Sequence, residues 1–352
     1  MNDFNLRLSV KTLKNIIQFL FTFILILFVI EFYFRASGVR TPAYFYDSKI
    51  LGRTQTPGRE IFKVDGHQFC IDKVNKYGYT GNGYPLKKGK NTIRIALFGD
   101  SFTEALQVFR RNRFSTIMER ELSKKLKKKV EVLDFGLAGD DFRGMYFRYL
   151  KMGIKYNPDY SIFIVQGEAF YNKKQIPTPD IYLENDSLKI SYAYIHNSAS
   201  KVRNEFELVR GSAIGNLFKD AYSAYSDGRL PSIILDKIYP FFKVNSDRPP
   251  DLDRFLKINK KIIDTLAYQN KIDYNKIVIV KMDTLTKFYE NYLKIKNFPE
   301  IDLNKFLIQH GGKEKLNYWK AGKIIAHWNN FGHHLIGEFL ARKIYDLMKT
   351  NN

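Results

Sequence analysis

An N-terminal stretch of the chain is apolar at nearly every position. Leu13 to Phe34 reads LKNIIQFLFTFILILFVIEFYF. A helix rises about 1.5 Å per residue, so about 20 residues cross the roughly 30 Å hydrocarbon core of a bilayer. Between Ile16 and Ile30 no helical face is left polar, which argues against a helix of a soluble core. The pattern predicts a short N-terminal tail over residues 1–12 and a transmembrane anchor over residues 13–35.

The residues at the two ends of the apolar stretch indicate whether it is cleaved and which way it crosses the membrane. A cleavable signal peptide would have a shorter apolar region and a small-residue exit site, which Arg35-Ala36-Ser37-Gly38 matches poorly. We therefore expect an uncleaved anchor. Basic residues flank the stretch on both sides, so the positive-inside comparison favours neither orientation. The short tail permits an N-terminus inside the cell.

Residues 36–90 are rich in Gly, Pro and Tyr, which predicts a linker followed by lead-in turns and short strands. Apolar runs bounded by turn residues then alternate with segments of helical periodicity. A strand, helix, strand, helix, strand order is typical of a parallel sheet with crossover helices. The predicted elements are strands 93–98, 130–135 and 160–165, and helices 114–126 and 144–154.

The alternation stops at about residue 170 and resumes near residue 250. We interpret residues 170–250, which are tyrosine-rich, as an insertion or lid. An amphipathic helix from Leu252, a strand over 276–281 and a C-terminal helix over 331–348 follow, and Asn329 or Asn330 could cap the last helix. We expect one α/β domain over residues 91–350, with the insertion inside it.

Composition narrows the function classes. Of 352 residues, 45% are hydrophobic and 26% charged, an ordinary globular mix, and the single Cys70 excludes an intramolecular disulfide. Lys and Arg number 57 against 36 Asp and Glu, a net charge of +21. The densest basic run, Lys124 to Lys129, fits a solvated helix end, and no nucleic-acid-binding motif accompanies it. We expect no nucleic-acid partner; the charge suits a domain near anionic headgroups or acidic glycans.

The motif that suggests chemistry follows the first predicted strand. Gly99-Asp100-Ser101 places a serine hydroxyl at the carboxyl edge of the sheet, where open α/β sheets bind ligands. A serine there could also simply cap a helix. However, His327 lies on a predicted turn just before the last helix, and the carboxyl ends of parallel strands share an edge. Serine and histidine together supply the nucleophile and base that acyl transfer needs.

The chain resembles the SGNH (GDSL-like) hydrolase family over roughly residues 75–348. The resemblance is carried by four segments in the family's order: GDSFTEALQV, DFGLAG, the strand ending in QGE, and HWNNFGHHLIGEFLA. It implies a three-layer, flavodoxin-like parallel sheet, here preceded by one transmembrane helix. Ser101 matches the nucleophile and lends its N–H to the oxyanion hole, Gly139 matches a second oxyanion donor, and His327 matches the base. No cofactor is implied.

Two positions depart from the family pattern. Ile324 and Ile325 stand where the family has the Asp that orients the catalytic histidine. Glu168 stands at the third-block position, where the family has an Asn that donates to the oxyanion. A protonated Glu168 could donate instead, and Glu168 or Asp302 could replace the missing acid beside His327.

Other residues near these motifs leave alternatives open. Asp100 could support the site. His333 and His334 are alternative bases, but they lie within the start of the last helix. A metal site built from the three histidines lacks further ligands, so we expect no metal.

Two functions from different classes follow from these observations. The first is a membrane-anchored acyl-ester hydrolase or O-acyltransferase acting on cell-envelope polysaccharide esters through Ser101 and His327. The second is a catalytically silent protein of the same fold that binds a glycan or a membrane partner. In both, the N-terminus is expected inside the cell and the domain outside the membrane, an orientation taken from the resemblance. The sequence carries no signal for an oligomeric state.

Overall fold

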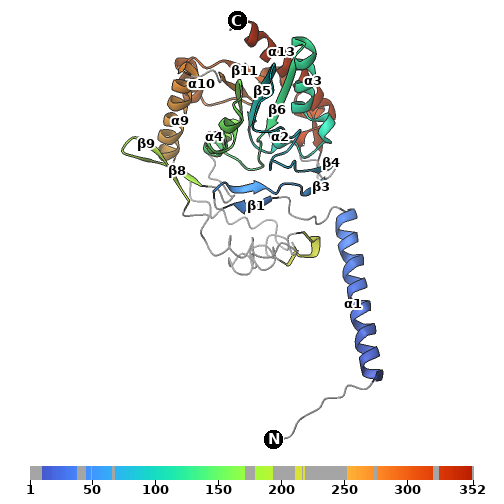
Figure 1. The fold of residues 1–352 in the computed structure, drawn as a ribbon. Helices are drawn as coiled ribbons and strands as arrows, with labels where there is room; N and C mark the ends of the chain where they lie inside the picture. Colours follow the sequence, from blue (N-terminus) through green and yellow to red (C-terminus); the bar gives the residue numbers. More distant parts are fainter. Residues whose placement is uncertain are drawn as a thin grey trace.

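A computed structural model shows one α/β domain and a long N-terminal helix that projects from it (Figure 1). The structure describes residues 10–37, 45–48, 50–65, 68–170, 179–192, 211–215, 217–218, 252–272, 276–319 and 325–350. Helix α1 spans Val10–Ser37. Its apolar part, Val10–Ala36, has a mean hydropathy of 2.4 and is not buried by the rest of the chain. By length and composition it can cross a membrane, and a signal sequence would look the same.

The domain is built on a five-stranded parallel sheet. Its strands are β5 (Thr92–Phe98), β6 (Lys129–Asp134), β7 (Tyr160–Val165), β10 (Lys276–Lys281) and β11 (Glu300–Asp302). Their order in the sheet is β11-β10-β7-β5-β6, and every pairing is parallel. Numbered along the chain this is the order 2-1-3-4-5, the flavodoxin-like arrangement. The predicted fold class is therefore confirmed.

Helices cover both faces of the sheet, so the domain has three layers (Figure 1). Alternate residues of a strand point to opposite faces: Ile95 and Leu97 pack with one set of helices, and Ala96 and Phe98 with the other. The first set is α3 (Phe114–Leu126) and α13 (Asn330–Thr350); the second is α4 (Phe142–Lys151), α9 (Leu252–Ile272) and α10 (Lys287–Ile295).

The predicted boundaries hold to within a few residues, with some differences. Helix α4 begins two residues before the predicted 144, because Asp141 caps it by accepting a hydrogen bond from the Gly144 N–H at 2.9 Å. The cap of α13 comes from Asn329, whose side-chain oxygen accepts from the Gly332 N–H at 2.8 Å. The predicted helix over 144–154 ends at Lys151 and continues as the 3₁₀ turn η2 (Gly153–Tyr156). Helix α10 was not predicted, although it is amphipathic. Other elements carry too few residues to show a period and were not predicted: η1 (Arg110–Asn112), η3 (Gly167–Phe170), β11, α11 (Leu303–Gln309), α12 (Gly312–Leu316) and β12 (Asn317–Trp319).

Small antiparallel hairpins surround the sheet. The lead-in forms β1 (Phe45–Ser48) with β2 (Gly52–Gln55), and β3 (Glu60–Asp65) with β4 (Gln68–Lys73). In the segment interpreted as an insertion, β8 (Asp180–Glu184) pairs with β9 (Ser187–Ser191). Most of residues 170–250 lies outside the described residues.

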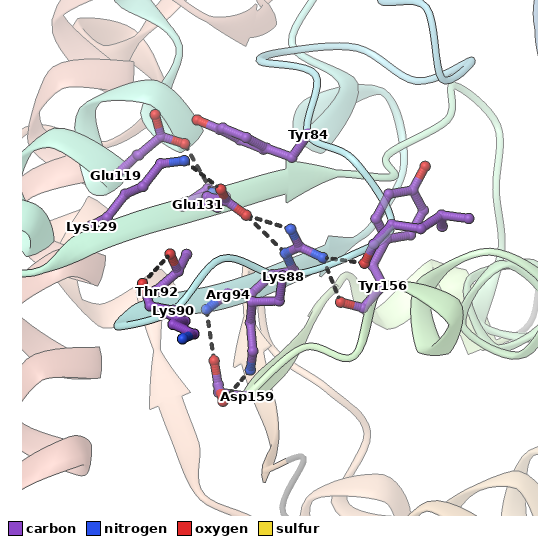
Figure 2. Close-up of polar contacts among 12 residues, drawn as sticks. Tyr84, Lys88, Lys90, Thr92, Arg94, Glu119, Lys129, Glu131, Tyr156 and Asp159 are labelled. Atoms are coloured by element: carbon purple, nitrogen blue, oxygen red, sulfur yellow. Dashed lines mark hydrogen bonds and ion pairs between the residues drawn. The ribbon is translucent and has the colours of Figure 1, made fainter.

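A buried ion pair closes the amino-terminal edge of the sheet (Figure 2). Arg94 of β5 is fully buried and donates to Glu131 of β6, with Nη2 to Oε2 at 2.5 Å. The same guanidinium donates to the carbonyl oxygens of Leu86 and Tyr156, at 2.9 and 2.7 Å. The Arg94 N–H donates to Asp159 at 2.7 Å. These bonds satisfy a charge that would otherwise be costly to bury, and they attach the lead-in to the sheet.

The end of α1 is bonded to the insertion. Glu31 pairs with Arg35 at 2.7 Å and accepts from Ser212 Oγ, Ala213 N and Ile214 N at 2.8, 2.8 and 3.0 Å. Arg35 in turn donates to the carbonyl oxygen of Gly211 at 2.7 Å. The one acidic residue in the apolar helix therefore has a full set of hydrogen-bond donors, and these contacts join the end of α1 to residues 211–214.

Candidate active site

The serine lies where β5 ends at the carboxyl edge of the sheet. Ser101 is the first residue of α2 (Ser101–Glu104), a one-turn helix, and Asp100 caps this helix by accepting from the Phe102 N–H at 2.9 Å. The neighbouring strands β6 and β7 lie on either side of β5. The turn thus stands next to the point where the strand order reverses, the usual ligand position in such sheets.

The histidine reaches this turn from the far end of the chain. His327 lies on strand β13 (Ile325–Trp328), which pairs with β12, so the expectation that it lies on a turn is wrong. The hairpin buries Trp328 against Phe102, whose ring is 4.6 Å from the imidazole of His327 and 4.9 Å from the indole. This packing holds the His327 Nε2 atom 2.7 Å from the Ser101 Oγ atom. The spacing is that of a serine nucleophile and its general base.

A tight turn after β6 lies beside the serine turn. The Leu137 N–H donates to the Gly99 carbonyl at 3.0 Å, which extends the parallel pairing of β5 and β6 beyond the strands. The Asp140 N–H closes the turn on the Leu137 carbonyl at 3.0 Å. Gly139 is the third residue of this four-residue turn and has φ +80°, a left-handed conformation that favours glycine at that position of a type II turn. Its exposed backbone lies at the same sheet edge as Ser101.

Gly136 explains how closely the two turns approach. A Cβ atom at this position would lie 2.4 Å from the Glu104 backbone nitrogen and 2.7 Å from the Thr103 carbonyl carbon. Both of those atoms belong to the backbone of α2, so a side chain here would force the helix to shift. Only glycine therefore lets the turn after β6 pack directly on the serine helix.

Asp100 has an unusual electrostatic environment. Burial raises the pKa of Asp100 to about 6. Hydrogen bonds from the Phe102 N–H and from the Gln166 side-chain amide lower it, but by less than burial raises it. The negative charges of Glu168 and Asp140 raise it further. Gln166, the first residue after β7, was not singled out from the sequence, because a lone glutamine at a strand end carries no distinguishing pattern.

The two carboxylates considered as replacements have different positions. Glu168 is an exposed residue of η3, near enough to Asp100 to raise the pKa of that carboxyl group. Asp302 lies at the end of β11, the edge strand, three strand positions and so roughly 14 Å from β5. Its carboxylate caps α11 by accepting from the Lys305 N–H at 2.8 Å. Asp302 therefore has a structural use away from Ser101.

The alternative histidines differ in the same way. His333 is buried in the core, stacked on the Phe114 ring, and its Nδ1 atom accepts from the Phe114 N–H at 3.3 Å. Burial lowers the pKa of His333 to about 3, so it is a neutral core residue. His334 is exposed and pairs with Glu338 at 3.3 Å. Within the described part of the chain, no group of three His, Cys, Asp or Glu residues is arranged to hold a metal ion.

Comparison with known proteins gives structural similarity only. No family model matches the sequence, and no curated protein does. The chain is similar to the lipase/acylhydrolase from Enterococcus faecalis, with 15% identity, a TM-score of 0.41, and coverage of 72% of this chain and 96% of that one. A protein assigned to the G-D-S-L lipolytic family from Desulfitobacterium hafniense is 14% identical, with a TM-score of 0.37 and coverage of 71% of this chain and 98% of that one. An acetyl xylan esterase is 17% identical, with a TM-score of 0.35 and coverage of 72% of this chain and 99% of that one.

Proposed function

We propose that this chain is a membrane-anchored acyl-ester hydrolase or O-acyltransferase with Ser101 as nucleophile and His327 as general base. The observation that carries the proposal is the 2.7 Å separation between Ser101 Oγ and His327 Nε2, reached by residues 226 positions apart. A serine hydroxyl is a weak nucleophile at neutral pH, and an imidazole within hydrogen-bond reach is what activates it.

The reaction would proceed in two halves. As Ser101 Oγ attacks the ester carbonyl carbon, its proton passes to His327 Nε2, and the carbonyl oxygen becomes an oxyanion. The N–H groups of Ser101 and Gly139 donate to that oxyanion. Collapse breaks the bond to the leaving alcohol, which takes the proton from His327 and leaves an acyl-serine. Water, or a sugar hydroxyl in the transferase case, then attacks the acyl carbon while His327 takes its proton. The bond from the acyl carbon to Ser101 Oγ breaks, and His327 returns the proton to the serine oxygen.

The site departs from a full triad, and this sets an expectation for its rate. Residues 324 and 325 are isoleucines, so neither of these positions offers a carboxylate to His327. In model hydrolases the loss of the triad Asp reduces turnover by about 10⁴. We therefore expect a slow hydrolase, or one whose acceptor binding compensates.

The position of the site supports the proposed substrate class. The β1–β2 and β3–β4 hairpins lie at the site end of the sheet, on the side from which α1 projects (Figure 1). If α1 crosses the bilayer, the site is held close to the membrane surface. An acylated polysaccharide of the cell envelope, outside a membrane with the N-terminus inside, fits this position and the net charge of +21.

A comparison of hydrolysis rates tests the proposal. Full-length protein in detergent is assayed with p-nitrophenyl acetate and with acetylated xylooligosaccharides, as wild type, Ser101→Ala and His327→Ala. We expect both variants to lose at least 10²-fold in kcat/KM. His334→Ala is the matched control, because His334 is exposed and pairs only at the surface. Equal rates for the wild type and Ser101→Ala would refute the proposal and leave the catalytically silent binding protein as the function.

A further inference from the structure

Glu104 is a buried carboxylate at the base of the site. It ends the one-turn helix that begins with Ser101, and its side chain is 2% exposed. One carboxylate oxygen accepts from Gln55 Nε2 at 2.6 Å, and the other accepts from the Ala138 N–H at 3.1 Å. Glu104 therefore joins three parts of the chain: the serine helix, the β1–β2 hairpin and the turn that carries Gly139.

A second link reaches the other side of the same turn. Arg148 of α4 donates through Nε to Asp140 Oδ2 and through Nη2 to the carbonyl oxygen of Arg53, both at 2.7 Å. Arg148 and Asp140 are both buried. The residues before and after Gly139 are thus each connected to β2, Ala138 through Glu104 and Asp140 through Arg148. The β1–β2 hairpin belongs to the segment predicted as a linker with lead-in turns and short strands, and it bonds to both sides of the Gly139 turn.

We propose that Glu104 is a positioning residue that holds the Gly139 turn in its donating conformation, with Arg148 supporting the far side. The inference rests on the proposed function, because it assigns the Gly139 N–H to the oxyanion. The direction of that N–H depends on the peptide plane between Ala138 and Gly139, and Glu104 holds the adjacent Ala138 N–H in place. Each oxygen of the Glu104 side chain accepts one of these bonds, and in a buried site a hydrogen bond is shielded from competition by water.

The chain contains a matched control for this arrangement. Glu119 of α3 accepts a backbone N–H, from Val132, and a lead-in side-chain amide, from Asn82, both at 2.9 Å, and it also bonds to the Tyr84 side chain. Burial raises the pKa of Glu119, as it does that of Glu104. Val132, however, lies inside β6, whereas Ala138 lies beyond the carboxyl end of that strand. Loss of Glu119 therefore removes a similar set of bonds without touching the oxyanion turn.

The test compares Glu104→Ala, Glu104→Gln and Glu119→Ala in the full-length protein. We expect Glu104→Ala to lower kcat by about 10- to 100-fold with little change in KM, less than the 10² to 10³ of an oxyanion donor lost outright. Glu104→Gln should restore most of kcat, because its carbonyl can accept from Ala138 and its amide can pair with a flipped Gln55 side chain. Glu119→Ala should lower the unfolding temperature similarly but leave kcat unchanged.

Hydrogen exchange measured by mass spectrometry provides a readout that does not depend on activity. Amides in a peptide covering residues 136–141 should exchange faster in Glu104→Ala and at the wild-type rate in Glu119→Ala. Unchanged exchange in Glu104→Ala, or equal losses of kcat in the two alanine variants, would overturn the inference. If wild type and Ser101→Ala hydrolyse esters equally, the proposed function fails. The exchange rates then still decide whether Glu104 holds the turn.

Discussion

Replacement of Asp100 by asparagine should stabilise the protein at neutral pH, although Asp100 is next to the proposed nucleophile. Burial raises the pKa of Asp100 from its ordinary 3.8 to about 6. The difference is roughly 2, and each pKa unit corresponds to about 1.4 kcal/mol, so the ionised carboxylate costs the folded state about 3 kcal/mol. Asparagine is as good a helix cap as aspartate and is always neutral.

The sign of the pH dependence follows from the two pKa values. Below about pH 4 both the folded and the unfolded chain hold the proton, and the wild type has its full stability. As the pH rises from 4 to 6 the unfolded chain loses its proton first, so the stability of the wild type falls. Above about pH 6 the loss is complete. The free energy of unfolding of Asp100→Asn should therefore exceed that of the wild type by an amount that grows between pH 4 and 6 and is then constant.

Urea unfolding of the full chain in detergent micelles, followed by tryptophan fluorescence, measures this difference. Trp328 is buried beside Phe102 and reports on the site directly. Glu168→Gln, which removes a neighbouring negative charge, should give a smaller change of the same sign. A difference between wild type and Asp100→Asn that is the same at pH 4 and pH 7 would refute the reasoning.

Three further predictions concern residues outside the site. Arg94→Met removes the buried partner of Glu131 and leaves the carboxylate paired with the exposed Lys129, 2.7 Å away, so it should cost about 3 kcal/mol in urea unfolding. Most of that cost should be recovered with Glu131→Leu, and equal costs for the single and double variants would contradict this. Burial lowers the pKa of His333 from its ordinary 6.5 to about 3, so below pH 6.5 the unfolded chain takes up a proton that the folded chain does not. The free energy of unfolding of the wild type should therefore fall by up to about 1.4 kcal/mol per pH unit between pH 6.5 and pH 3. His333→Gln should flatten that slope, and an unchanged slope would count against a buried neutral His333. Glu31→Ala removes the acceptor of three donors and should speed hydrogen exchange in residues 211–215, whereas Gln18→Ala, in the middle of α1, should not; protection that persists in Glu31→Ala would show that the contact with α1 is not needed.

The hydrophobic pattern by itself determined the main elements. Strands β5, β6, β7 and β10 and helices α3, α9 and α13 follow from it, because burial on one face or on both imposes a period on the sequence. The order of these elements along the chain predicted a parallel sheet, since right-handed crossovers leave few other arrangements. Ser101 was found for the same reason: a strand that ends in a small residue and a polar pair places that pair at the ligand-binding edge.

Only the tertiary structure decided what surrounds the serine. His327 was identified by its motif, but its 2.7 Å approach to Ser101 depends on the β12–β13 hairpin, whose short strands have no period to detect. Glu104, Gln166 and Arg148 gave no sequence signal, because charged and amide residues are usually exposed. Here they are buried or half-buried by hydrogen bonds to partners 34 to 95 positions away. Side-chain periodicity is set by neighbours along the chain, whereas a hydrogen-bonded site is set by segments that meet only after the sheet has formed.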